Sequence, residues 1–214
     1  MSDPIVYGPN YSTYARSARL ALEEKGVPYR LEEVDLIQGA AAQPPHLKRH
    51  PFARVPAFEH DGFPLYETAA IERYVDETFP GPKLQPEDPK PRARMAQIVS
   101  IIDAYAYSAL IGKCVWQRIV MPIIGQKTDE AVIAEAMPRV ECSMEALETL
   151  ADPTGPYLCG PGLCLADLHV APVMAYFAET PEGKSLLAKS PKLTRWWKEM
   201  SARPSMAKTQ PKLG

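Results

Sequence analysis

Two hydroxyl side chains stand where predicted helices begin. Ser12 follows an apolar strand candidate at Ile5–Tyr7 and precedes a helix predicted to run to Lys25, with Gly26 as its stop signal. Thr68 precedes a second amphipathic segment and is the expected N-cap of that helix. A hydroxyl and the backbone amides at a helix N-terminus donate hydrogen bonds to anions, so both positions are candidates for binding negative charge.

The cysteines form no recognisable catalytic or metal-binding pattern. All four, Cys114, Cys142, Cys159 and Cys164, lie in the second half of the chain. They include neither a C-x-x-C pair nor a Cys/His spacing typical of zinc sites. The sequence therefore predicts reduced thiols, mostly buried, and no metal site.

Composition and charge exclude several classes of protein. Hydrophobic residues make up 46% and charged residues 23% of the 214 residues, as in ordinary globular chains. The net charge of −2 and the absence of a basic block argue against nucleic acid and anionic membranes as partners. The first residues lack the basic flank and apolar core of a signal peptide, so the expected compartment is cytoplasmic.

The first half predicts a β-α-β unit followed by a hairpin and a helix. Tyr29–Leu36 is the second strand candidate, which the intervening helix would place parallel to the first. Ala57–His60 and Phe63–Tyr66 flank Asp61–Gly62, a favoured two-residue hairpin turn. Pro64 suits an edge strand because proline donates no backbone hydrogen bond.

The second half predicts helices alone, after a linker rich in proline. We assign residues 1–80 to an α/β domain, 81–91 to the linker and 92–214 to an all-helical domain. Apolar residues at helical spacing predict four helices, over 95–109, 132–150, 168–178 and 193–200. Pro138 is expected to kink the second of them.

Three segments together resemble the cytosolic glutathione S-transferases. They are Ser12–Gly26 (STYARSARLALEEKG), His50–Phe58 (HPFARVPAF) and Tyr66–Ile71 (YETAAI). A later segment, Leu163–Leu168, resembles the capping motif before a buried helix in that family. The likeness covers the whole chain and is to serine-type members, phi- or theta-like or bacterial. It implies a thioredoxin-like N-terminal domain, a helical C-terminal domain, a homodimer, and a glutathione site at the edge of the first domain.

The resemblance implies that Ser12 activates the thiol of glutathione. A cysteine-type thiol has a pKa of about 8.5, and each unit by which it is lowered requires about 1.4 kcal/mol of preferential thiolate stabilisation. A hydroxyl donor at a helix N-terminus is suited to supply it. Ser12 could instead be an ordinary N-cap, and Tyr7 is the main rival donor, ahead of Tyr11 and Tyr14.

The resemblance also implies which residues bind the tripeptide. Val55–Pro56 resembles the cis-proline turn whose exposed backbone pairs with the cysteinyl part of glutathione. Glu67 would hold the γ-glutamyl ammonium, and Thr68 would hold the neighbouring carboxylate. Arg54 would serve the glycyl carboxylate or a neighbouring backbone group.

One departure affects the glycyl end of the tripeptide. Plant serine-type relatives place a His-Lys pair where this chain has Ala41 and Ala42. The possible substitutes are His46, Lys48, Arg49 and His50.

The second substrate would bind on the inner face of the first long helix. The candidate residues are Tyr105, Tyr107, Ser108, Ile111 and Trp116, with Tyr176 from a later helix. Asp167 is expected to cap a buried helix, although Cys164 replaces the Ser or Thr found in relatives.

The resulting hypothesis is a dimeric glutathione transferase that conjugates the glutathione thiolate to small hydrophobic electrophiles in detoxification. A glutathione-dependent peroxidase or isomerase, and a non-catalytic glutathione- or ligand-binding protein, remain as alternatives on the same fold.

Overall fold

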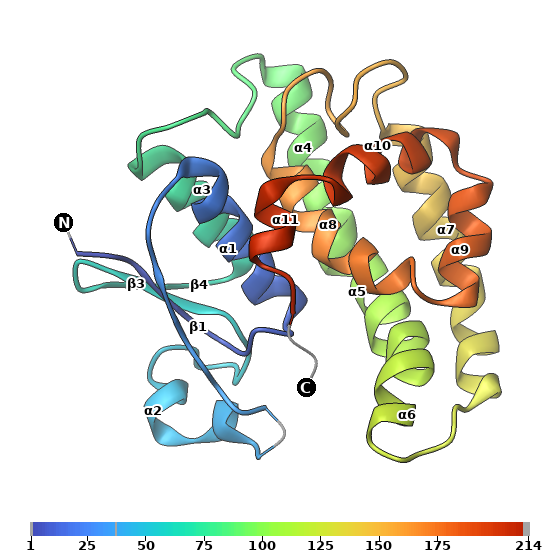
Figure 1. Cartoon of the computed structure of the whole chain (residues 1–214), viewed down its shortest axis with the longest axis horizontal. Helices are drawn as coiled ribbons and strands as arrows, with labels where there is room; N and C mark the ends of the chain where they lie inside the picture. The colour runs from blue at the N-terminus through green and yellow to red at the C-terminus, as the bar shows by residue number, and fades with distance from the viewer. Residues whose placement is uncertain (1, 37, 212–214) are drawn as a thin grey trace. The chain divides into compact units, whose positions relative to one another are not determined.

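The computed structural model describes residues 2–36 and 38–211 of the chain. It divides into two compact units, one made of Met1–Gln85 with Ala202–Gly214 and the other of Pro86–Ser201 (Figure 1). The first, which we call the α/β unit, contains the sheet. The second, the helical unit, contains helices and loops.

The α/β unit is built on a four-stranded sheet with the order β2-β1-β3-β4. The strands are β1 (Ile5–Tyr7), β2 (Arg30–Glu32), β3 (Ala57–His60) and β4 (Phe63–Tyr66). β1 is parallel to β2 and antiparallel to β3, and β3 pairs antiparallel with β4. The predicted β-α-β unit, hairpin and edge position of Pro64 are confirmed. β2 is shorter than predicted, because residues 33–36 do not pair.

Two helices begin at the same end of this sheet, where β1 and β4 end. α1 (Thr13–Lys25) begins at the N-cap Ser12 and ends at Gly26, whose φ of 67° is left-handed, both as predicted. α3 (Thr68–Thr78) was predicted to have Thr68 as its N-cap, and this is wrong: Glu67 is the N-cap and Thr68 is the first helical residue.

The proline-containing stretch before β3 contains two short helices. These are η1 (Ala40–Ala42) and α2 (Pro44–Leu47). Proline fits the first turn of a helix because its missing N–H would have no partner there. Pro44 occupies that position in α2.

A buried ion pair joins the ends of α1 and α3. Lys25 Nζ lies 3.2 Å from Asp76 Oδ1, and the two side chains are 0% and 2% exposed. The ammonium also donates to the backbone oxygens of Asp76 and Pro82, at 3.1 and 2.9 Å. Asp76 Oδ1 accepts a further hydrogen bond from the Leu84 amide. The pair therefore fixes the proline-rich segment that follows α3.

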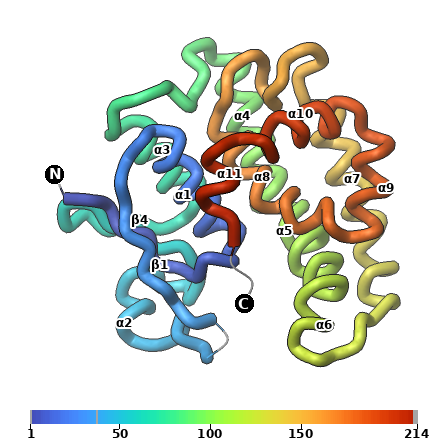
Figure 2. The backbone as a smooth tube through the Cα atoms, in the orientation of Figure 1, coloured from blue at the N-terminus to red at the C-terminus, as the bar shows by residue number. Residues whose placement is uncertain are grey.

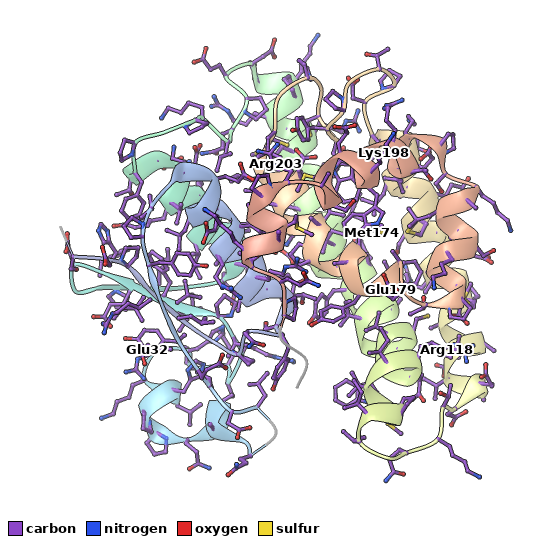
Figure 3. All side chains as sticks on the ribbon, in the orientation of Figure 1. Glu32, Arg118, Met174, Glu179, Lys198 and Arg203 are labelled. Atoms are coloured by element: carbon purple, nitrogen blue, oxygen red, sulfur yellow. The ribbon has the colours of Figure 1, made fainter. Side chains whose placement is uncertain are left out.

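The C-terminal segment belongs to the α/β unit, whereas residues 92–214 were assigned to the helical domain. α11 (Pro204–Lys208) packs against α1, and the tube in Figure 2 follows this return of the chain. The Arg16 guanidinium donates to the backbone oxygen of Met206 at 2.9 Å. Arg203, labelled in Figure 3, forms a two-pronged ion pair with Glu24. These long-range polar contacts leave no signature in the local sequence pattern.

Glu24 makes the docking of α11 sensitive to acid. Burial raises the pKa of Glu24, but the hydrogen bonds from Arg203 and Ser205 outweigh burial and hold it below its ordinary value of 4.5. A lowered pKa contributes stability that is complete above the ordinary value and is lost as pH falls through the lowered one. We expect the free energy of unfolding to fall as the pH drops below 4.5. The Glu24→Gln protein should have a lower free energy of unfolding at pH 7, and this free energy should fall less steeply with acid. Chemical denaturation from pH 7 to pH 3 measures both, and an identical pH profile for the two proteins would contradict this assignment.

The helical unit is organised around a long helical run and a buried helix. The run spans α4 (Pro89–Ile101), η2 (Ile102–Ala106), α5 (Tyr107–Ala109), η3 (Leu110–Val120) and α6 (Met121–Ile123). The other helices are α7 (Glu130–Leu150), α8 (Leu165–Phe177), α9 (Pro181–Ala188) and α10 (Pro191–Ser201). α8 is almost wholly buried and contacts α4 and α10 (Figure 1).

All four predicted helices exist, and each begins before its predicted first residue, whereas α7 ends at Leu150 as predicted and α8 ends at Phe177, one residue early. The first grows most, because η2 and η3 have π-helical geometry, which the 3.6-residue period does not describe. Pro138 lies inside α7, and α9 was not predicted. By length and composition alone the run Pro89–Ile123 could cross a membrane, and 44% of its most apolar window is buried inside the protein.

Candidate functional site

The strand register brings the predicted site residues of the α/β unit to one end of the strands, which we call the site edge of the sheet. Tyr7 of β1 lies opposite Ala57 of β3, and Ala57 lies opposite Tyr66 of β4. β1 and β4 end at this edge, while β3 begins there. Gly8, Pro56 and Glu67, the next residues outward, therefore share one row across three neighbouring strands. With strands about 4.8 Å apart, this row spans roughly 10 Å.

Ser12 lies just beyond this row, at the start of α1. Its side-chain oxygen accepts a hydrogen bond from the Ala15 amide at 3.2 Å, and the side chain is partly exposed. The hydroxyl proton remains available to an external acceptor, because an N-cap serine uses only a lone pair for the cap. No acidic residue lies in the first turn of α1 to oppose a bound anion. Capping and anion stabilisation are thus compatible at Ser12.

Gly8 allows the turn before α1 to approach the proline turn. A side-chain carbon at Gly8 would lie 3.1 Å from the Ala15 side chain and 3.4 Å from that of Val55. These distances connect the N-terminal turn of α1 to the segment that begins β3. No local sequence pattern reveals this close approach at Gly8.

Val55 and Pro56 have the conformation that the resemblance implies. Their peptide bond is cis, and Val55 is partly exposed while Pro56 is buried. Arg54 has an exposed side chain, and its backbone oxygen is 2.7 Å from His46 Nε2. This contact with a buried histidine fixes the backbone just before Val55.

Glu67 has an unusual backbone conformation at the N-terminus of α3. Its φ is 69°, in a region that residues other than glycine rarely adopt, at a cost of about 1–2 kcal/mol. The side chain makes no capping hydrogen bond and is 67% exposed. Thr68 is 8% exposed, and its first-turn amide has no acceptor within the helix. The strained conformation directs a carboxylate and a helix N-terminus to the same edge of the sheet.

His50 leaves the charge of Glu67 uncompensated at neutral pH. The imidazole is 3% exposed and packs on the Tyr66 ring, with centroids 4.8 Å apart. Burial lowers the pKa of His50, and His46 and Arg54 lower it further, although Glu67 opposes them. Its Nε2 is 4.0 Å from Glu67 Oε1, beyond hydrogen-bonding distance. His50 is therefore neutral at pH 7.

The rival tyrosines are engaged elsewhere. Tyr7 is 8% exposed and packs with Val34, Ala41 and Ala57, while its hydroxyl is 3.4 Å from Glu59 Oε2. Burial, followed by the charges of Asp35 and Glu33, raises the pKa of Tyr11, whose hydroxyl bonds to the backbone of Leu36.

The candidate substitutes for the His-Lys pair differ in whether their side chains already contact other residues or face solvent. Arg49 stacks over the Tyr7 ring at 4.1 Å and donates to the Pro45 backbone oxygen. His46 is buried, whereas Lys48 is exposed. Ala41 is 7% exposed and forms part of the core below β1, so its position offers no ligand group.

Five of the six predicted second-substrate residues lie along the long helical run of the helical unit, and the sixth, Tyr176, lies in α8. Tyr105 is 55% exposed and Trp116 is 47% exposed, whereas Tyr107 is partly buried. The Arg139 guanidinium of α7 lies 5.8 Å from the centroid of the Tyr105 ring. Tyr105 and Trp116 fall in the π-helical segments, a geometry often found at functional sites. Across residues 2–36 and 38–211, no cluster of three His, Cys, Asp or Glu side chains could hold a metal ion.

Family models match both units of the chain. Residues 3–77 match the glutathione S-transferase N-terminal domain, and residues 107–204 match the glutathione S-transferase C-terminal domain. A probable glutathione S-transferase from Oryza sativa subsp. japonica is 32% identical over 207 residues, covering 95% of this chain and 93% of the relative.

Solved structures agree with this match. Glutathione transferase F7 from Populus trichocarpa superposes with a TM-score of 0.85 and 30% identity, over 96% of this chain and 97% of that one. Glutathione S-transferase I from maize, in complex with an atrazine glutathione conjugate, superposes with a TM-score of 0.80 and 29% identity, over 97% and 96% of the two chains.

Proposed function

This chain belongs to the cytosolic glutathione S-transferase family and is a transferase that uses glutathione as co-substrate. From that premise we propose which of its residues activate the thiol, bind the tripeptide and select the second substrate. Ser12 donates a hydrogen bond from its hydroxyl to the glutathione sulfur and so stabilises the thiolate. The thiolate then attacks an electrophile, while the thiol proton passes to solvent. The observation that supports this best is the shared sheet edge, where Ser12, the Val55–Pro56 turn and the N-terminus of α3 converge.

The dimensions of this edge suit an extended tripeptide. Three extended residues span roughly 10 Å, which is also the width of the three strands. In this arrangement the Val55 backbone pairs with the cysteinyl residue, so the sulfur reaches Ser12. Glu67 and Thr68 hold the ammonium and carboxylate of the γ-glutamyl residue. Arg54 is the proposed partner of the glycyl carboxylate, because its guanidinium is exposed whereas Arg49 is engaged.

The helical unit is proposed to select the second substrate. Tyr105, Tyr107 and Trp116 supply aromatic surface for an electrophile with an apolar body. The biological role would then be detoxification. The cytoplasm is the proposed place of action, since the four cysteines are free.

Glu67→Gln is expected to weaken glutathione binding by about 10- to 100-fold, the equivalent of a charge-assisted hydrogen bond of roughly 1.5–3 kcal/mol. The substitution keeps the shape of the side chain and removes the charge that would hold the ammonium. Isothermal titration with glutathione measures the change. Glu32→Gln is the matched control. Glu32 is an exposed carboxylate in β2, where it pairs with Tyr7 of β1, and β2 is not one of the three strands that form the proposed site (Figure 3). Equal effects of the two substitutions would refute a specific role for Glu67.

The homodimer is proposed from an exposed aromatic side chain. Phe52 is 69% exposed and lies beside His50 and Tyr66, with ring centroids 6.3 Å from each. Phenylalanine is among the aromatic residues that are enriched at protein interfaces, and this exposed ring supports an interface here.

We expect the wild-type chain to sediment as a dimer and Phe52→Ala to weaken dimerisation at least tenfold, the loss typical of an interface hot spot. Phe63→Ala is the control, because Phe63 is 49% exposed in the same unit but lies in β4. Analytical ultracentrifugation over a concentration series separates the outcomes, and a monomeric wild type would refute the proposal.

A further inference from the structure

Two cysteine side chains meet at the entrance to the buried helix α8. Cys164 is the N-cap of α8 and is 1% exposed, whereas Cys159 is partly exposed. The two side chains are close enough for the Cys159 thiol to raise the pKa of Cys164. The catalytic proposal above uses neither residue, and neither forms a disulfide.

Asp167 places the two cysteines side by side. Its Oδ1 accepts a hydrogen bond from the Leu158 amide at 2.8 Å, and its Oδ2 accepts one from the Cys164 amide at 2.7 Å. Trp196 Nε1 donates to the same Oδ1 at 2.9 Å. One buried carboxylate thus holds the residue before Cys159 and the backbone of Cys164.

The loop that carries Cys159 is held rigidly. Tyr157 and Gly160 form an antiparallel bridge, with amide-to-oxygen distances of 3.2 and 3.3 Å, so Cys159 lies within a tight turn. Gly160 has a φ of 130°, which only glycine adopts readily. Gly155 packs so closely against the Gly160 backbone that a side chain there would collide with it. The backbone conformation of the turn that carries Cys159 is therefore constrained.

We propose that Cys159 and Cys164 form a dithiol site that glutathione disulfide oxidises to an intramolecular disulfide bond. In the first step, the Cys159 thiolate attacks one sulfur of glutathione disulfide, which forms a mixed disulfide and releases one glutathione. In the second step, Cys164 attacks the Cys159 sulfur and releases the second glutathione. The two thiol protons leave on the two glutathione molecules, so the dithiol is oxidised and the glutathione disulfide is reduced.

The environments of the two thiols set this order. The contact with Cys159, together with burial, raises the pKa of Cys164 well above its ordinary value. Cys164 is therefore a protonated thiol at neutral pH and a poor first nucleophile. Cys159 is the more accessible thiol and reacts first. Once the mixed disulfide exists, the Cys159 thiol no longer raises the pKa of Cys164, and Cys164 passes its proton to the departing glutathione as it attacks the Cys159 sulfur beside it.

Oxidation would also change the helix cap. In the reduced protein the Cys164 sulfur faces the Asp167 amide within a capping box. A sulfur bonded to Cys159 is redirected across the turn, so the first turn of α8 loses part of its cap. The oxidation state of this pair is thereby linked to the most deeply buried helix of the helical unit.

The test uses full-length protein carrying Cys142→Ser, which removes the exposed thiol at that position. The protein is equilibrated with mixtures of glutathione and glutathione disulfide, acid-quenched, and examined by intact mass and peptide mapping. The expected product is lighter by two hydrogens, carries no glutathione and contains a Cys159–Cys164 cross-linked peptide. Cys114 remains a thiol, because burial raises its pKa to about 11.

A second variant tests the order of the steps. Cys164→Ser keeps a good N-cap, since serine is a preferred capping residue, so this variant is expected to fold. It should accumulate the Cys159–glutathione mixed disulfide that the protein with Cys164 resolves. Two results would overturn the proposal: an adduct on Cys159 that persists equally with and without Cys164, or two unreacted thiols at disulfide ratios that fully modify Cys142 in the wild type.

Discussion

Replacing Ser12 with alanine is expected to lower the turnover number by about 10²- to 10³-fold, the usual cost of losing a hydrogen-bond donor to a reactive anion. Glutathione affinity should change little, because Glu67, Thr68 and the Val55 backbone are unaltered. The ultraviolet absorbance of the thiolate, followed against pH in the bound complex, measures the cause directly. The thiol pKa should be low in the wild type and should return toward about 8.5 in the variant.

One control separates this effect from the loss of a helix cap. Ser12→Ala removes the hydrogen bond to Ala15, which costs about 1 kcal/mol of stability by itself. Asp88→Ala removes a comparable cap from α4, where Asp88 accepts from the Lys90 amide, and should leave the thiol pKa unchanged.

Tyr7→Phe tests the rival donor. It removes the hydroxyl that contacts Glu59 and keeps the packed ring, so turnover should stay within about twofold of wild type. The catalytic role would belong to Tyr7 if the pKa of the bound glutathione thiol returned to about 8.5 in Tyr7→Phe and stayed at the wild-type value in Ser12→Ala.

Replacing Lys25 with methionine is expected to destabilise the protein by about 3–5 kcal/mol, because it leaves the buried carboxylate of Asp76 without its ion-pair partner. Methionine retains most of the apolar stem, so the loss reports on the charge and its hydrogen bonds. The ammonium also donates to the backbone oxygens of Asp76 and Pro82, and these would lose a buried donor. Equilibrium unfolding in urea at pH 7 measures the difference.

Arg73→Met is the matched control for this experiment. Arg73 pairs with Glu77 on the same helix, α3, but the two side chains are 68% and 53% exposed. Exposed pairs of this kind contribute about 0.3–0.5 kcal/mol. If both substitutions cost the same small amount, the buried pair would not be a main determinant of stability.

Local sequence rules predicted the features that depend on local chemistry. The first and last caps of α1 follow from the types of residue at Ser12 and Gly26, and the hairpin follows from Asp61–Gly62. The cis bond at Val55–Pro56 was expected only from the family resemblance, since the dipeptide alone favours trans.

Features that depend on tertiary contacts could not be predicted in this way. The capping rule favoured Thr68, because threonine is a better N-cap than glutamate and glutamate disfavours a positive φ. The chain instead turns at Glu67, where β4 ends in register with β3. The close approach at Gly8 and the contact between Cys159 and Cys164 likewise join segments that no short pattern connects.

The return of α11 to α1 has a consequence for the order in which the protein is completed during synthesis. Because the α/β unit includes Ala202–Gly214, the helical unit is topologically an insertion within it. A ribosome has therefore produced every residue of the helical unit before the partners of Arg16 and Glu24 are made. The α/β unit gains α11 only after the whole helical unit has been made, so the helical unit is the first of the two to have its full sequence available for folding.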